Sequence, residues 1–304
     1  MTRRLDVLKQ IPPLMPKFLG KRRAGITIVA ELMQELGVDR PVLFMMRDLD
    51  LIQGSYGGPV SLSQIHADNP YTIIDYASPR LNALIEKGLA QQNEEGAYSL
   101  TPRGKDAVDR LHQAGREHVA QLHPLPDDEL EMLAHQLERA VKSILADPNL
   151  APRPGSRLAS SRYLATFSDD APAMVRIEQA IFDLWMARDD THQRAWRDAE
   201  LEAPALDVLS QLWSGEAHTV GDLQRVLEDR QTPADLESSL AFLLDKDYIT
   251  RDGDGVELTP QGALVREDIE RETDSLYFAP WPHTLAEAEW LRDKLTQLVS
   301  NLPG

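Results

Sequence analysis

The chain contains no cysteine, which excludes disulfide bonds, thiolate zinc sites and cysteine nucleophiles. It also lacks a long hydrophobic run: no apolar stretch approaches the ~18 residues of a membrane helix. Residues 1–23 are interrupted by charges and prolines and do not resemble a signal peptide. From these absences we expect a soluble, cytoplasmic protein that has no membrane partner.

Positive charge is scarce as well, because 32 Lys and Arg face 49 Asp and Glu, which gives a net charge of −17. Residues 1–23 are the exception, with seven basic side chains against one acidic, so the rest of the chain carries about −23. An acidic body repels phosphate backbones, whereas a basic arm steers toward them. Residues 1–23 are therefore interpreted either as a basic N-terminal arm that contacts phosphates or as an ordinary charged terminus.

The sequence does contain an internal repeat, because residues 238–261 resemble residues 78–103. In each copy an i, i+3, i+4 apolar stripe predicts a packed helix, which is followed by two short strand patterns. Acidic, glycine-containing turns separate the strands at residues 93–96 and 252–255. Leu-Thr-Pro then opens a new helix, with Thr as the N-cap. This order predicts a winged helix in each half of the chain.

Helical periodicity dominates the remaining sequence. Predicted helices span residues 25–37, 42–52, 62–67, 102–122, 127–146, 172–199, 204–213 and 220–227, and a last one begins at the Thr284 capping box with Glu287. In the first of these, Ile26, Val29, Ala30, Met33 and Leu36 share the apolar face. The helices at 127–146 and 172–199 space their apolar residues by 3 and 4, which is typical of a coiled-coil seam.

The predicted fold class is mainly α with small β-hairpin wings, built as tandem winged helix-turn-helix units with flanking pairing helices. Three prolines and a glycine in residues 147–156 are the strongest linker signal in the chain. We therefore expect a basic arm at 1–23, a first winged-helix domain at 24–146, a linker at 147–157 and a second, divergent winged-helix domain at 158–304.

Leu62-Ser-Gln-Ile65, RLNALIEKGLA at 80–90 and SLTPRGKDAVDRL at 99–111 resemble the winged helix of MarR-type transcription regulators. The resemblance covers residues 24–146 well and 200–275 more loosely. It implies a regulator of transcription that binds double-stranded DNA and responds to a small-molecule effector. In that family two chains pair through terminal helices, so a chain with two copies would be an intramolecular pseudo-dimer, or would form a homodimer.

The same resemblance implies DNA contacts from the stretch that matches the reading helix and from the residue after the wing. These candidates are Tyr71, Thr72, Ser78, Arg80, Asn82 and Arg103. Pro79 suggests that the helix restarts with Ser78 as its cap.

Acidic residues depart from the family pattern where DNA would be touched, since residues 222–257 hold ten acids against four bases. Phosphate binding depends on Lys and Arg. The alternative is therefore a winged-helix scaffold or protein-interaction module that has lost DNA binding.

A second polar cluster suggests a ligand site. It comprises Trp185, Arg188, Asp189, His192 and Trp196, which helical spacing brings to neighbouring turns. It is interpreted either as the wall of a small-ligand pocket or as a network that holds helices together. No third metal ligand accompanies Asp189 and His192, and no phosphate loop or catalytic signature is present. We expect no metal, no cofactor and no enzyme activity.

Two further segments carry weaker expectations. His112, His118 and His123 are spaced by six and five residues, which does not place them on one helical face, so we expect them to be solvated. The aromatic stretch at 277–282 is interpreted either as a ligand lid or, preferably, as a rigid turn whose rings dock on the core.

Overall fold

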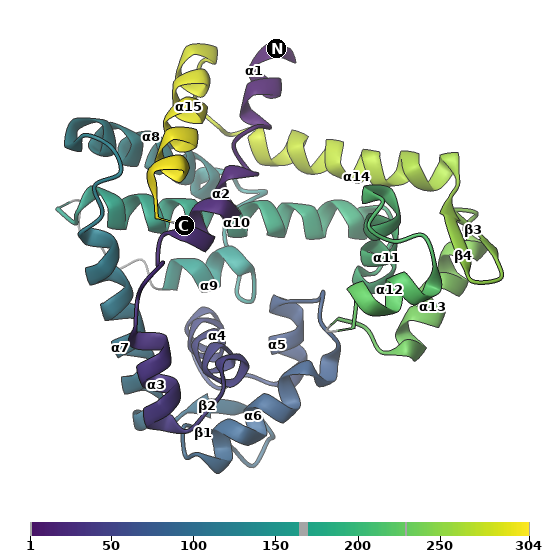
Figure 1. The fold of residues 1–304 in the computed structure, drawn as a ribbon, viewed down its shortest axis with the longest axis horizontal. Helices are drawn as coiled ribbons and strands as arrows, with labels where there is room; N and C mark the ends of the chain where they lie inside the picture. The colour runs from purple at the N-terminus through teal and green to yellow at the C-terminus, as the bar shows by residue number, and fades with distance from the viewer. Residues whose placement is uncertain (1, 164–169, 229, 304) are drawn as a thin grey trace. The chain divides into compact units, whose positions relative to one another are not determined.

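The computed structural model describes residues 2–163, 170–228 and 230–303, drawn in Figure 1. Its contacts divide the chain into two compact units. Unit 1 comprises residues 1–61, 80–190 and 277–304, and unit 2 comprises residues 62–79 and 191–276. The segment 147–157, expected to be a linker, lies inside unit 1. The division of the chain into two sequential domains stays a prediction.

Unit 1 is built around a bundle of helices drawn from both ends of the chain. It includes α1 (Thr2–Leu8), α2 (Leu14–Lys21), α8 (Asp127–Ala146), α9 (Arg157–Tyr163), the first part of α10 (Ala173–Asp198) and α15 (Leu285–Asn301). Both expected seams enter its core: Leu133 and Leu137 of α8 are fully buried, as are Ile177 and Ile181 of α10. The capping box at Thr284 is present, and α15 lies beside α1 (Figure 1).

The basic N-terminal segment is folded into this bundle rather than extended as an arm. Leu8, Ile11 and Phe18 are completely buried in the unit 1 core. The guanidinium of Arg4 donates to backbone carbonyls, and the Lys21 ammonium donates to the carbonyl oxygen of Val299 at 3.3 Å. Several of its cations are thus used to fix the segment in place.

The first wing also belongs to unit 1. Helix α3 (Ile28–Leu36) precedes α4 (Arg40–Tyr56), and α6 (Ala77–Glu86) leads into β1 (Ala90–Gln92), β2 (Tyr98–Leu100) and α7 (Pro102–Ala120). The strands are antiparallel, with Ala90 opposite Leu100. Val60 forms an isolated antiparallel bridge to Tyr98 of β2. The helix-strand-turn-strand-helix order predicted from the sequence is present here.

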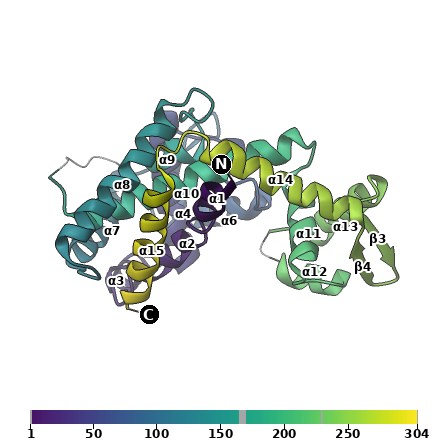
Figure 2. The ribbon, with the colours of Figure 1, turned by 90° about the horizontal axis from the view of Figure 1, so that it is seen from above.

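Unit 2 contains the second wing. Helices α11 (Ala203–Ser214), α12 (Val220–Val226) and α13 (Pro233–Asp245) are followed by β3 (Ile249–Asp252), β4 (Gly255–Leu258) and α14 (Pro260–Phe278), as Figure 2 shows from above. Thr219 bridges to Gly255 as Val60 does to Tyr98. Two elements from the first half, α5 (Leu62–Asp68) and η1 (Ile74–Tyr76), also belong to this unit. The predicted fold class, mainly α with small hairpin wings, is confirmed.

The backbone has the same structure at the junction between each wing and its flanking helices. The helix before each wing ends at a residue in the left-handed region, Gly88 with φ 66° and Asp247 with φ 58°. The threonine after each wing donates its hydroxyl to the carbonyl oxygen of that residue: Thr101 to Gly88 at 2.8 Å and Thr259 to Asp247 at 2.6 Å. Each Thr also caps the next helix, as predicted.

The close approach across each junction requires glycine. A Cβ at Gly104 would lie 2.0 Å from the carbonyl oxygen of Leu89, and one at Gly262 would lie 2.0 Å from that of Tyr248. Both distances are far below van der Waals contact, and the obstacle is backbone, which cannot rotate away. Both winged helices therefore require glycine at the same position and for the same steric reason.

Two expectations about side-chain burial are wrong. In α3 Leu36 of the predicted apolar face is buried, but Ala30 is exposed and Leu32, which lies outside the predicted set, is completely buried. His112 is buried on the inner face of α7, where burial and nearby Arg23 lower its pKa to about 3.

Two other expectations hold. His123 is exposed, and Tyr277, Phe278 and Trp281 dock edge to face in the core, in agreement with the preferred interpretation. No helix among the residues described is long and apolar enough to cross a bilayer.

Candidate nucleic-acid interface

The second copy has the local geometry of a helix-turn-helix. The Thr219 hydroxyl caps α12 by accepting from the Asp222 amide at 3.0 Å. Thr232 opens α13 with a complete capping box to Asp235, and Pro233 occupies the first turn. These reciprocal bonds satisfy orphan amides at the start of the helix and fix its origin. Helix α13 is therefore a well-defined candidate reading helix, followed directly by its wing.

The exposed surface of that reading helix is acidic. Asp235, Glu237 and Asp245 are all exposed. The Arg251 guanidinium of the wing donates to the Glu237 carboxylate at 2.9 Å, which raises the pKa of Arg251 through that hydrogen bond. On α12 a hydrogen bond from Arg225 lowers the pKa of Asp222 to about 2, so this carboxylate is ionised at neutral pH. Such a surface has the wrong sign for a phosphate backbone.

The candidate residues of the first copy divide between the two units. Arg80 and Asn82 lie on α6 and Arg103 lies in the first turn of α7, all in unit 1. Asn82 and Arg103 are exposed and Arg80 is half-buried. One amino group of Arg103 donates to the carbonyl oxygen of Lys87 at 3.0 Å, and this bond ties Arg103 to the end of the helix.

The other three candidates, Tyr71, Thr72 and Ser78, are half-buried residues of unit 2. Tyr71 packs edge-on against Trp196 with ring centroids 6.4 Å apart, and the Trp196 indole donates to its hydroxyl at 3.2 Å. Thr72 donates its hydroxyl to the carbonyl oxygen of Asn69 at 3.1 Å. Tyr71 and Thr72 thus stabilise unit 2, and sequence spacing gave no sign of this role.

Residues of the expected ligand cluster contact side chains on neighbouring helices. Asp189 pairs with the Arg157 guanidinium of α9 at 3.2 Å. His192 Nδ1 lies 3.1 Å from the hydroxyl of Thr273, which is on α14. Trp185, Arg188 and Asp189 fall in unit 1, whereas His192 and Trp196 fall in unit 2. A shared ligand wall stays a prediction, and these contacts are of the kind that the alternative interpretation expects.

A model of a helix-turn-helix family matches residues 172–303. The matched segment runs from α10 to α15 and includes α12, α13 and the second wing. No curated protein and no solved structure matches the chain. The match supports a helix-turn-helix domain in the second half, which suggests a DNA-binding regulator. It falls on the copy that resembles MarR-type regulators more loosely by sequence.

Proposed function

We propose that this chain is a MarR-like, DNA-binding transcriptional regulator in which two winged helices, related by internal duplication, are carried by one polypeptide. The observation that carries the proposal is the helix-turn-helix match over residues 172–303, together with a capped reading helix followed by a wing. The matching junctions at Gly104 and Gly262 support the duplication. Fold alone does not establish function, so the proposal depends on a binding measurement.

The pairing that two chains provide in MarR-type regulators is supplied here within one chain. The seams of α8 and α10 are buried in a single core, and Arg176 of α10 pairs with Glu138 of α8 at 2.8 Å. A seam that is already buried is not available to a second copy. We expect a monomer of 34.1 kDa by light scattering after gel filtration. A species of twice that mass would favour the homodimer.

The first copy is the better DNA reader in this proposal, because the exposed Arg103 donates to a backbone carbonyl whereas Arg251 donates to the Glu237 carboxylate. The test is fluorescence anisotropy with a pool of labelled random duplexes, titrated with protein at several salt concentrations. We expect binding at low salt that weakens as salt rises, since phosphate contacts release counterions. A sequence-specific site would then be selected from the same pool.

The acidic α13 surface and the internal use of Tyr71 favour a second candidate function, a winged-helix scaffold that binds another protein. If the folded chain shows no affinity for any duplex at low salt, DNA binding is excluded and the scaffold function is favoured. Circular dichroism of the same sample distinguishes that outcome from simple unfolding.

A further inference from the structure

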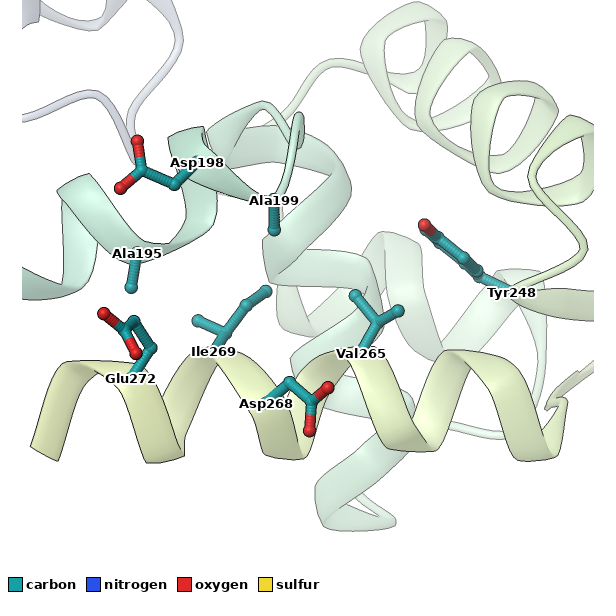
Figure 3. Close-up of a pocket in the computed structure, with 8 residues that line it drawn as sticks. All are labelled: Ala195, Asp198, Ala199, Tyr248, Val265, Asp268, Ile269 and Glu272. Carbon is teal, nitrogen blue, oxygen red and sulfur yellow. The ribbon is translucent and has the colours of Figure 1, made fainter. Parts of the chain in front are cut away.

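Unit 2 contains a pocket of about 340 Å³. It is not lined by any of the residues discussed above for DNA contact. One wall is the end of α10, where Ala195 and Ala199 point toward α14 (Figure 3). The opposite wall is α14, where Val265 and Ile269 point back toward α10. Pockets of this size accommodate small organic molecules. Both walls are apolar, and Ala195 and Ile269 are buried within the unit 2 core.

The remaining lining residues give the pocket one sign of charge. Asp198 comes from α10, Asp268 and Glu272 come from α14, and the Tyr248 ring closes one end. All four lining residues of α14 follow helical spacing, with the apolar pair at 265 and 269 and the acidic pair at 268 and 272. In the part of the chain that the structure describes, no lysine or arginine lines the pocket.

Two of these three carboxylates have an arginine partner on their own helix, and in the described part of the chain the third does not. Asp198 has a 3.6 Å ion pair with Arg194, and Asp268 pairs with Arg271, but these side chains are exposed and such pairs contribute little. Among the described residues Glu272 has no hydrogen-bond or ion-pair partner, and in Figure 3 it reaches toward Ala195. Like charges four residues apart on one helix are also mildly unfavourable. A bound cation would relieve that repulsion.

We propose that this pocket binds a small organic cation, in which an ammonium group is carried on an aromatic or branched aliphatic body. The apolar walls take the body, and the carboxylate of Glu272, which reaches toward Ala195 in Figure 3, faces the charge, with Asp268 one turn away on the same helix. The Tyr248 ring offers a cation–π surface, which contributes most when the cation is partly desolvated. The Glu272 carboxylate, which has no ion-pair partner among the described residues, repels a carboxylate or phosphate ligand and attracts a cation.

Isothermal titration calorimetry with benzyltrimethylammonium tests this assignment in the full chain without DNA, so its outcome is independent of the proposed DNA binding. We expect saturable binding at one site, whereas sodium phenylacetate, which has the same ring and a negative charge, does not bind. The double variant Asp268→Asn, Glu272→Gln should bind the cation at least tenfold more weakly. Glu267→Gln is the matched control, because Glu267 is exposed on the same helix and does not line the pocket.

A third variant separates the pocket from general attraction to an acidic protein. Ala199→Leu keeps every charge and fills the space between α10 and α14, so we expect it to abolish binding while the melting temperature stays near that of the parent. Absence of saturable cation binding would overturn the assignment. So would equal binding by the double variant and Glu267→Gln, or undiminished binding by a folded Ala199→Leu protein.

Discussion

The two wings share a backbone junction and differ in the surface that surrounds it. Thr101 and Thr259 make the same two hydrogen bonds, and the glycine three residues later is required in both copies. By contrast, α13 begins at a complete capping box, whereas α6 follows directly on η1 and has Pro79 in its first turn. A missing amide is tolerated there, so Pro79 does not force the expected restart at Ser78.

This difference teaches which parts of a winged helix are fixed by packing. The junction is held by a backbone-to-backbone approach that tolerates no side chain, so a substitution there has an immediate cost. The surface of the reading helix is solvated, and outside the capping box its charges can change sign with little effect on the fold. Acidic residues on α13 are therefore compatible with an intact winged helix and, apart from Asp235 of the capping box, bear on the partner alone.

The largest expected effect comes from filling the junction. Gly104→Ala and Gly262→Ala each place a Cβ 2.0 Å from a carbonyl oxygen, and each should lower the free energy of unfolding by about 3 kcal/mol. Urea denaturation followed by circular dichroism measures this. Gly20→Ala is the control, because its Cβ would meet nothing within 4 Å. A large loss at only one of the two positions would break the proposed equivalence of the copies.

The junctions were largely predictable from sequence because Leu-Thr-Pro, a glycine and a regular apolar stripe are local signals. The seams of α8 and α10 were predictable for the same reason. The helical packing of residues 1–23 was not, because prolines interrupt the periodicity and the apolar side chains are distributed over two short helices. The burial of His112 and the pairing of Tyr71 with Trp196 depend on tertiary contacts that one sequence does not display.

Each copy has a buried carboxylate, Asp50 on α4 and Asp207 on α11, and burial raises the pKa of both. The 159 residues that separate Leu81 from Leu240 in the repeat also separate Asp48, whose side chain is 42% exposed, from the buried Asp207. Burial raises the pKa of Asp207 to about 6 from an ordinary value of 3.8. Protonation is thus easier in the folded state, and the stability it contributes is present below pH 4 and is lost as pH rises through 6.

Asp207→Asn should therefore reduce the pH dependence of unfolding between pH 4 and 6, leaving the contribution of the buried Asp190, whose pKa is also about 6, and should stabilise the protein at pH 7 by about 2 kcal/mol. Asp48→Asn is the matched control and should leave the profile unchanged. Urea denaturation across this pH range measures both variants. Parallel profiles for Asp207→Asn and the parent would show that Asp207 is already charged in the fold without penalty.

Charge reversal compares the copies as DNA readers. Arg103→Glu and Arg80→Glu should each weaken duplex binding about tenfold at low salt, because each removes a cation and adds an anion near the phosphates. Arg251→Glu should have a smaller effect, since this guanidinium is already neutralised by Glu237. Anisotropy with the random duplex pool gives all three affinities. If Arg251→Glu weakens binding as much as the others, the second copy contacts DNA as well.

The smallest expected effect is an exchange of residues at the left-handed position before each wing. A Cβ at Gly88 would meet nothing within 4 Å, so Gly88→Asp tests backbone strain alone and should cost about 1 kcal/mol. Asp247→Gly should relieve a similar strain, offset in part by the greater freedom of glycine in the unfolded chain. Thermal unfolding should therefore shift in opposite directions for the two variants. Shifts of the same sign would mean that the Asp247 side chain stabilises its junction through contacts that Gly88 lacks, and the two helix ends would then be alike in shape but not in energetics.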